Sequence, residues 1–146
     1  MSTTTIRRGS IDEVYALAKA IPEFKDLYPK SVFEKNLGDN KSLMLIAEIE
    51  NSVVGFKAGY EQEQDGSFYS WMGGVFPKFR GKGVARRLAN QMEEWAVKKR
   101  YSKIKMTTRN KNKAMLIFAI SNGFELTSIE ERTPIGENRI FLEKEL

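Results

Sequence analysis

Four basic side chains surround two glycines in the segment RGKGVARR, residues 80–87, and this segment contains no acidic residue. The basic residues are Arg80, Lys82, Arg86 and Arg87. The start of a helix normally favours Asp or Glu, because its free N–H groups carry partial positive charge. Positive side chains are favourable there when an anion binds to the same helix end, and Gly81 and Gly83 leave the backbone open to it. The segment therefore predicts a phosphate site that suits a pyrophosphate.

Two common phosphate motifs do not fit this segment. A P-loop requires glycine at position 76 and Ser or Thr at position 83, where this chain has Phe76 and Gly83. The dinucleotide fingerprint requires glycine where Arg86 stands. The alternative interpretation is a solvated basic turn, which is common in a protein of net charge +5.

The composition excludes several kinds of chemistry. The 146 residues include no Cys, which excludes disulfides, thiolate metal sites and a Cys nucleophile. They include no His, the commonest general base and metal ligand, so we expect no metal site. The first ten residues lack the apolar segment of a signal peptide, and no apolar run approaches the ~20 residues of a membrane helix. We expect a cytoplasmic protein without a membrane partner.

Hydrophobic periodicity predicts a single α+β domain over residues 1–146. Expected strands lie at residues 3–10, 43–50, 53–63, 67–76, 103–108, 124–131 and 138–146. Expected helices begin after Ser10 and at Ser31, each with a capping box (Glu13, Glu34), and cover residues 84–99 and 113–122. Asp65-Gly66 indicates a hairpin turn, and Gly123 ends the last helix. Hairpins and crossovers together predict a mixed, mostly antiparallel sheet of about six to seven strands, flanked by about four helices.

Two segments resemble motifs of the GNAT acetyltransferase family, and the resemblance covers residues 6–142. The strand ending in valine and the run RGKGVA, residues 80–85, are similar to the family's acetyl-coenzyme A motif, R/Q-x-x-G-x-G/A. The segment NKAMLIFAISNGF, residues 112–124, is similar to the family's Asn-helix-Gly-Phe segment. The resemblance implies a GNAT-like fold, with acetyl-coenzyme A as cosubstrate.

The resemblance also implies where the cofactor binds. Its pantetheine arm would pair with residues 72–76 as an added strand, and this strand and the next would splay apart. Gly73-Gly74 would form a bulge, with the Gly74 amide as oxyanion donor; the alternative is a bulge made for packing against Trp71 or Trp95. The cofactor-binding residues it implies are Val75, Phe76, Arg80, Gly81, Lys82, Gly83, Val84, Ala85 and Asn112.

One position departs from the family pattern. Many members carry a tyrosine seven residues after the asparagine, as general acid for the leaving thiolate, and this chain has Ala119 there. None of its five tyrosines lies on that helix, so the role cannot be transferred. An attacking amine must lose a proton, so a general base is useful. The candidate bases are Glu61 and Glu63. The alternative for both is a solvated charge at the end of a strand. The predicted acceptor contacts are Phe24, Tyr28, Tyr69 and Trp71.

The leading hypothesis is an acetyl-coenzyme A-dependent N-acetyltransferase in which a primary amine attacks directly in a ternary complex. The expected acceptor is a small-molecule or peptide amine, and the expected state is monomer or homodimer. The rival is a non-catalytic sensor or regulator that binds acyl-coenzyme A with the same fold. A nucleic-acid-binding module is a third interpretation, but the basic run KKRYSKIK includes Ile104, which has the pattern of a buried strand residue, and we expect no nucleic-acid partner.

Overall fold

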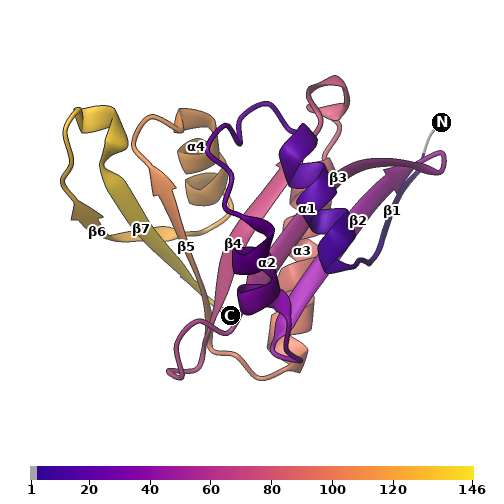
Figure 1. Ribbon diagram of the computed structural model, residues 1–146. Helices are drawn as coiled ribbons and strands as arrows, with labels where there is room; N and C mark the ends of the chain where they lie inside the picture. Colours follow the sequence, from indigo (N-terminus) through magenta and orange to yellow (C-terminus); the bar gives the residue numbers. More distant parts are fainter. Residues whose placement is uncertain (1–2) are drawn as a thin grey trace.

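The computed structural model describes residues 3–146, so residues 1 and 2 of the predicted domain lie outside the described part (Figure 1). The strands are β1 (Thr4–Arg8), β2 (Ser42–Ile49), β3 (Ser52–Tyr60), β4 (Ser67–Val75), β5 (Lys103–Arg109), β6 (Glu125–Glu130) and β7 (Arg139–Glu145). The α-helices are α1 (Ile11–Ala20), α2 (Lys30–Leu37), α3 (Val84–Lys98) and α4 (Lys113–Ser121). Short 3-10 helices occupy Pro77–Phe79 and Ile135–Glu137.

All seven strands form one sheet in the order β1-β2-β3-β4-β5-β7-β6. Every neighbouring pair is antiparallel except β4 and β5, which run parallel. The parallel pair requires a crossover, and α3 supplies it between the two strands. The predicted fold class, an α+β domain with a mostly antiparallel sheet, is confirmed.

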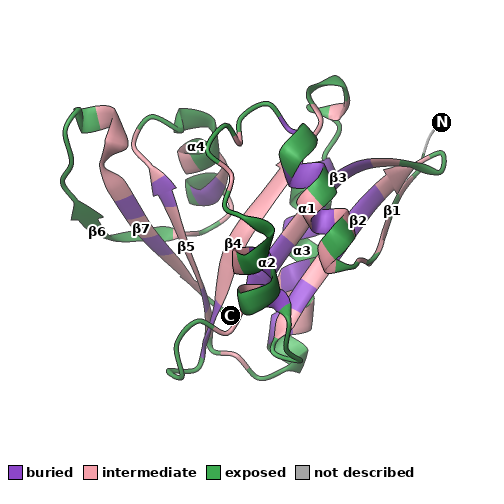
Figure 2. Cartoon of the chain, in the orientation of Figure 1, coloured by how far each residue is buried: buried purple, intermediate pink, exposed green. Residues whose placement is uncertain are grey.

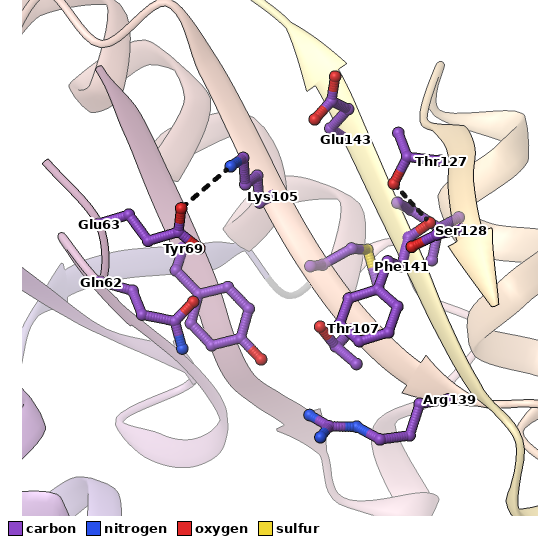
Figure 3. Close-up of a pocket in the computed structure, with 12 residues that line it drawn as sticks. Gln62, Glu63, Tyr69, Lys105, Thr107, Thr127, Ser128, Arg139, Phe141 and Glu143 are labelled. Carbon is purple, nitrogen blue, oxygen red and sulfur yellow. Dashed lines mark hydrogen bonds and ion pairs between the residues drawn. The ribbon is translucent and has the colours of Figure 1, made fainter. Parts of the chain in front are cut away.

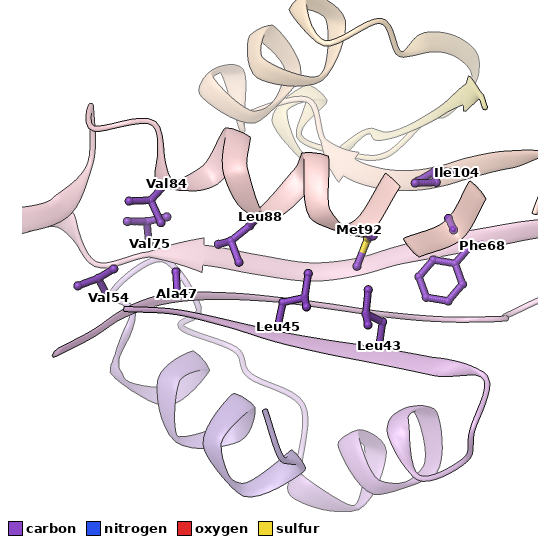
Figure 4. Packing of buried hydrophobic residues seen from close by; sticks show 11 residues of the cluster. Leu43, Leu45, Ala47, Val54, Phe68, Val75, Val84, Leu88, Met92 and Ile104 are labelled. Carbon is purple, nitrogen blue, oxygen red and sulfur yellow. The ribbon is translucent and has the colours of Figure 1, made fainter. Parts of the chain in front are cut away.

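The first four strands are covered on both faces. The helices α1 and α2 pack on one face, where Val14, Phe33 and Phe56 are fully buried. On the other face, Figure 4 shows Leu43 and Leu45 of β2 pointing toward side chains of α3. We call β1–β4 with α1, α2 and α3 the covered half.

The last three strands are covered on one face only, by α4. Their cluster of buried residues consists of Ala119 on α4 with Ile140 and Leu142 on β7. Figure 2 shows that β6 is exposed along its whole length. We call β5, β6, β7 and α4 the open arm.

The sheet divides between these two parts. β4 and β5 pair over only three positions, Ser67↔Lys103, Phe68↔Ile104 and Tyr69↔Lys105. Beyond these positions the two strands continue to Val75 and Arg109 without pairing with each other, and Figure 1 shows them diverging. This splaying agrees with what the resemblance implied, and it leaves one edge of β4 open along residues 70–75.

Three local expectations have different outcomes. The capping box of Ser10 and Glu13 is confirmed, with the Glu13 N–H 3.2 Å from Ser10 Oγ and the Ser10 N–H 3.1 Å from Glu13 Oε1. The second capping box is wrong, because α2 begins at Lys30 after Pro29 and Ser31 lies inside the helix. The Asp65-Gly66 turn is confirmed in a longer loop, where Gly66 has φ +85° and Asp65 accepts a hydrogen bond from the Ser67 N–H.

The bulge predicted at Gly73-Gly74 lies instead at Trp71. Ala58 pairs with Met72 and Gly59 with Ser70, so the extra residue of β4 is the tryptophan between them. The glycines serve close packing. A Cβ on Gly74 would lie 2.8 Å from Ile21 Cδ1, and one on Gly73 would lie 3.2 Å from the Phe56 carbonyl oxygen.

Candidate active site

The loop between β4 and α3 has the backbone of an anion site. Gly81 and Gly83 have φ values of +76° and +80°, and a Cβ on either residue would meet nothing within 4 Å. Glycine is therefore required here by the left-handed backbone rather than by crowding. Gly83 is the N-cap of α3, with no side-chain cap and no acid in the first turn. The N–H groups of the first turn remain available for an anion.

The four basic side chains of this loop have different partners. Arg80 forms two hydrogen bonds to Glu23, at 2.5 and 2.9 Å, and its Nε donates to the Val75 carbonyl at 2.8 Å. The hydrogen bond from Arg80 lowers the pKa of the Glu23 carboxyl. Arg87 donates to the Thr4 carbonyl, which connects α3 to β1. Within residues 3–146, the side chains of Lys82 and Arg86 make no hydrogen bond or ion pair, so both charges can meet an anion.

The remaining predicted cofactor residues lie on both sides of the opening. Val75 and Val84 are buried in the core shared by β4 and α3, Phe76 packs toward α1, and Ala85 is exposed. Asn112 lies across the opening, after β5, where its Nδ2 donates to Thr108 Oγ1 at 3.2 Å. It is the N-cap residue of α4 without a capping hydrogen bond.

The free edge of β4 presents alternate peptide groups to the opening. The Phe76 N–H donates to the Val54 carbonyl of β3 at 2.9 Å. Because N–H directions alternate along a strand, the Gly74 N–H also points to β3, and those of Gly73 and Val75 point to the open side. The amide predicted to stabilise an oxyanion, that of Gly74, therefore has its hydrogen directed away from the opening.

A groove of about 210 Å³ lies on the α1 and α2 side of the sheet, where the strands separate. We call it the sheet groove; Figure 3 shows Gln62, Glu63 and Tyr69 on one wall and Thr107, Arg139 and Phe141 on the other. The residues that line it are Gln62, Glu63, Tyr69, Lys105, Met106, Thr107, Thr127, Ser128, Arg139, Phe141, Leu142 and Glu143. Its walls combine polar side chains with Met106, Phe141 and Leu142, which suits a ligand with both polar and apolar parts.

Charges in and beside the sheet groove are largely paired. Lys105 Nζ lies 3.6 Å from a Glu63 carboxylate oxygen and 2.7 Å from one of Asp65. The hydrogen bond from Lys105 holds the pKa of the Asp65 carboxyl below its usual range. Glu143 is bound to Lys103 at 3.2 Å.

The predicted acceptor residues divide into groove and packing positions. Tyr69 lines the sheet groove and is the end of an aromatic row that continues through Tyr60 and Trp71 to Tyr28, with ring centroids 5.7, 5.9 and 5.8 Å apart. Burial raises the pKa of the Tyr60 phenol. Phe24 packs 6.3 Å from the Phe56 ring and beside Gly74, so it belongs to the core that holds the α1–α2 loop on β4.

The two candidate bases have different surroundings. Glu61 forms an ion pair with Lys41 at 3.3 Å and interacts with Tyr101. Burial, with help from Glu61, raises the pKa of Tyr101 to about 12. Glu61 does not line the sheet groove, whereas Glu63 does. Of the two carboxylates, only Glu63 therefore lies where the β4 and β5 strands separate.

A second cavity, of about 30 Å³, lies on the other face of the sheet, and we call it the helix-side cavity. It is lined by Lys57, Ser70, Ala89, Met92, Glu93, Ile104, Met106, Met115, Phe118, Ala119, Asn122 and Phe124. Met106 lines both cavities, so they approach each other where β4 and β5 separate. Lys57 is a site candidate that sequence reasoning missed; the available signal was a lysine inside the apolar strand VVGFKAGY.

The described residues contain neither a cluster for a metal ion nor a helix that could span a membrane. Residues 3–146 contain no cluster of three or more Asp or Glu side chains arranged to hold a metal ion. None of the helices in this range has the length and hydropathy needed to cross a membrane.

Comparison with known proteins gives a consistent result. Residues 11–124 match the model of the Acetyltransferase (GNAT) family. The fold is similar to that of the ribosomal-protein-S18-alanine N-acetyltransferase from Escherichia coli (TM-score 0.83, 15% identity, covering 98% of this chain and 94% of that one). It is also similar to the IAA acetyltransferase from Bacillus cereus ATCC 14579 (TM-score 0.80, 18% identity, covering 99% of this chain and 100% of that one). A third similar structure is a GNAT family acetyltransferase from Elizabethkingia anophelis with acetyl-CoA bound (TM-score 0.79, 20% identity, covering 98% of this chain and 98% of that one).

Proposed function

Because the chain belongs to the GNAT acetyltransferase family, we propose that it transfers the acetyl group of acetyl-coenzyme A to a primary amine of a small molecule or peptide. The observation that carries this proposal is the opening between β4 and β5. The loop with Gly81 and Gly83, which we call the anion loop, lies at one end of this opening, and a cavity adjoins the opening on each face of the sheet. The two substrates can therefore meet at one point from opposite faces.

The residues of the loop fit the cofactor. Free N–H groups at the start of α3 would bind the pyrophosphate, and Lys82 and Arg86 would add charge. Arg80 acts through its contacts: it holds Glu23 and the Val75 carbonyl, and so fixes the loop against β4. The open edge of β4 would pair with the pantetheine amides as a further strand would.

The thioester oxygen needs a hydrogen-bond donor as negative charge develops on it. We assign this role to the amide of Gly73 in place of Gly74, because the N–H of Gly73 points to the open side of β4. The nucleophile would be the acceptor amine itself, since the chain has no Cys. A Lys-like amine titrates near ~10.4, so loss of its proton must precede attack. Glu63, at the sheet groove, is the carboxylate placed to assist.

The test is a thiol-release screen with acetyl-coenzyme A and a library of amines at several pH values. We expect turnover with at least one amine, and initial-rate lines that intersect, as for direct attack in a ternary complex. Parallel lines would require an acyl-enzyme and would overturn direct attack.

A non-catalytic acyl-coenzyme A sensor is the second candidate, and Ala119 is the observation that favours it. This residue is buried and supplies no hydroxyl at the helix-side cavity. Tight binding of acetyl-coenzyme A without turnover of any amine in the screen would favour this candidate over the enzyme.

A further inference from the structure

Lys57 occupies an unusual position for a lysine. It lies in β3 between Phe56 and Ala58, both fully buried, and pairs with Leu45 on one side and Gly73 on the other. Its side chain is directed to the α3 face, opposite to that of Phe56. A Cβ on Gly73 would lie 3.4 Å from Lys57 Cγ. The missing side chain at Gly73 therefore leaves space for the lysine stem to cross β4.

The lysine reaches the helix-side cavity, which contains Ser70 of β4, Met106 of β5 and Ala119 of α4. Ser70 and Met106 lie immediately beyond the last paired positions of β4 and β5, Tyr69 and Lys105. The cavity thus adjoins the opening at the point where the two strands separate. Its volume of about 30 Å³ is enough for a water molecule or a small group.

Lys57 is not engaged by other side chains. In the described chain its ammonium group forms no hydrogen bond and no ion pair, although the residue is only partly exposed. The nearest charged group from α3 is Glu93, and Glu93 is bound by Lys144 of β7 at 2.8 Å. The lining residues from β4, β5 and α4 are not titratable. Burial lowers the pKa of Lys57 to about 8, and the Glu93 carboxylate opposes this only in part.

This environment suits proton transfer to a thiolate. A thiol of the Cys type titrates near ~8.5, and an acid is most effective when its pKa lies near that of its partner and near the working pH. At neutral pH Lys57 is mostly an ammonium, yet it loses its proton far more easily than a surface lysine. No other lining residue of the helix-side cavity except Glu93 can exchange a proton, and Glu93 is paired.

We propose that Lys57 is the general acid of this enzyme: its ammonium group donates a proton to the sulfur of coenzyme A as the thioester breaks. The amine nitrogen forms a bond to the acetyl carbon, and the carbon–sulfur bond breaks with its electron pair passing to sulfur. Sulfur takes a proton from Lys57 Nζ, and neutral Lys57 regains one from solvent, which receives the proton lost by the attacking nitrogen. The products are an amide and free coenzyme A thiol. This inference rests on the proposed function, because it requires coenzyme A to bind in the opening.

The first experiment measures, without turnover, how the charge of Lys57 changes the titration of the coenzyme A thiol. Free coenzyme A is bound to the whole protein, and its thiolate is followed by ultraviolet absorbance as pH rises. We expect the bound thiol to titrate about one pH unit or more below free coenzyme A in wild type and in Lys57→Arg. In Lys57→Met this lowering is lost. The matched control is Lys103→Met. Lys103 lines neither cavity and is bound to Glu143, so this variant should keep the wild-type titration of the bound thiol.

The second experiment separates charge from proton donation. With the best amine of the screen, Lys57→Met and Lys57→Arg should both lose about 10²-fold in kcat and keep the wild-type KM for acetyl-coenzyme A, since arginine does not release its proton. Competitive labelling of wild type with acetic anhydride, read by peptide mass spectrometry, should place the titration of Lys57 near 8, below the ~10.4 of a free lysine side chain in a reference peptide.

Several results overturn the proposal. Three results would each exclude the acid role: a bound thiol that titrates alike in wild type and Lys57→Met, an unchanged kcat in Lys57→Met, or a Lys57 that titrates like the lysine of the reference peptide. A Lys57 that becomes acetylated during turnover would make it an acceptor instead. Failure of coenzyme A to bind to wild type overturns the proposed function as well, whereas the first three results concern Lys57 alone.

Discussion

The covered half and the open arm share one sheet, but they differ in how that sheet is protected from water. In the covered half, helices bury both faces, and Phe33, Phe56 and Phe68 are fully enclosed. In the open arm only α4 covers the sheet, and the opposite face forms one wall of the sheet groove. That face presents polar side chains, such as Thr107 and Arg139, around Phe141.

This difference separates two tasks. The loop that would bind the pyrophosphate joins β4 to α3, the two most enclosed elements at the opening, so its backbone is held by a packed core. The proposed acceptor site is the sheet groove, and the wall of this groove that belongs to the open arm contributes little to packing. Substitutions on that wall can change the acceptor at low cost to stability, whereas Val75 and Val84, which hold the loop, cannot change without disturbing the core.

The largest expected effect comes from deleting the same side chain in both parts. Leu43 of β2 and Leu142 of β7 are each about 1% exposed. Removal of a buried leucine side chain costs about 2–5 kcal/mol, and less where the site can collapse. We expect Leu43→Ala to lie near the upper end and Leu142→Ala near the lower end, because Leu142 belongs to a much smaller cluster of buried residues than Leu43. Urea unfolding measures both; an equal or larger loss in Leu142→Ala would contradict the comparison.

Ligand binding should divide between the loop before α3 and the sheet groove. Joint replacement of Lys82 and Arg86 by alanine should weaken acetyl-coenzyme A binding by about 1.5–3 kcal/mol, as for hydrogen bonds to a charged group. Tyr69→Ala should raise the KM for the acceptor and leave acetyl-coenzyme A affinity nearly unchanged, since Tyr69 lines the sheet groove. Calorimetry and steady-state kinetics give the two quantities. If each substitution changes both of them equally, the two sites are not separate.

The covered half should also contain one destabilising residue, Lys57. Its pKa is about 8 in the folded protein and near ~10.4 in the unfolded chain, so the unfolded state binds more protons between these values. Folding therefore carries the full cost of burying the charge below pH 8, and the cost disappears as pH rises to about 10.4. Lys57→Met should be more stable than wild type by about 1–2 kcal/mol at pH 7, a value reduced for partial exposure.

The measurement is the difference in unfolding free energy between the two proteins from pH 6 to pH 10. Lys103→Met is again the control, because Lys103 is bound to Glu143 rather than buried. A difference that stays constant with pH would mean that packing of the methionine, and not the charge, causes it.

The features that could be predicted from sequence are those specified by neighbouring residues. The element order follows from periodicity, and the anion loop follows from glycines and charges within a few positions of each other. The features that could not be predicted join distant segments. Arg80 binds Glu23, 57 positions away, and this pair removes one of the expected cations from the anion site. Lys57 and Ala119 line one cavity although they belong to β3 and α4.

Errors within single elements have a similar cause. The bulge was predicted at two glycines, but the glycines are required by contacts with Ile21 and with the Phe56 carbonyl, and the extra residue is Trp71. The local sequence pattern therefore indicates that a position requires a particular residue, such as glycine. Only the packing around that position shows why the residue is required.

The smallest expected effect tests this distinction at two serines of the covered half. Both Ser10 and Ser31 precede a glutamate by three positions, as in a capping box, and both are exposed. Only Ser10 caps a helix: its Oγ accepts the Glu13 N–H, and Arg7 holds the Glu13 carboxylate at 2.6 Å. Ser10→Ala should therefore cost about 1 kcal/mol. Ser31 lies within the first turn of α2, where alanine is the better helix former, so Ser31→Ala should be neutral or stabilising by a few tenths of a kcal/mol. Equal losses in urea unfolding would mean that the start of α2 at Lys30 is wrong.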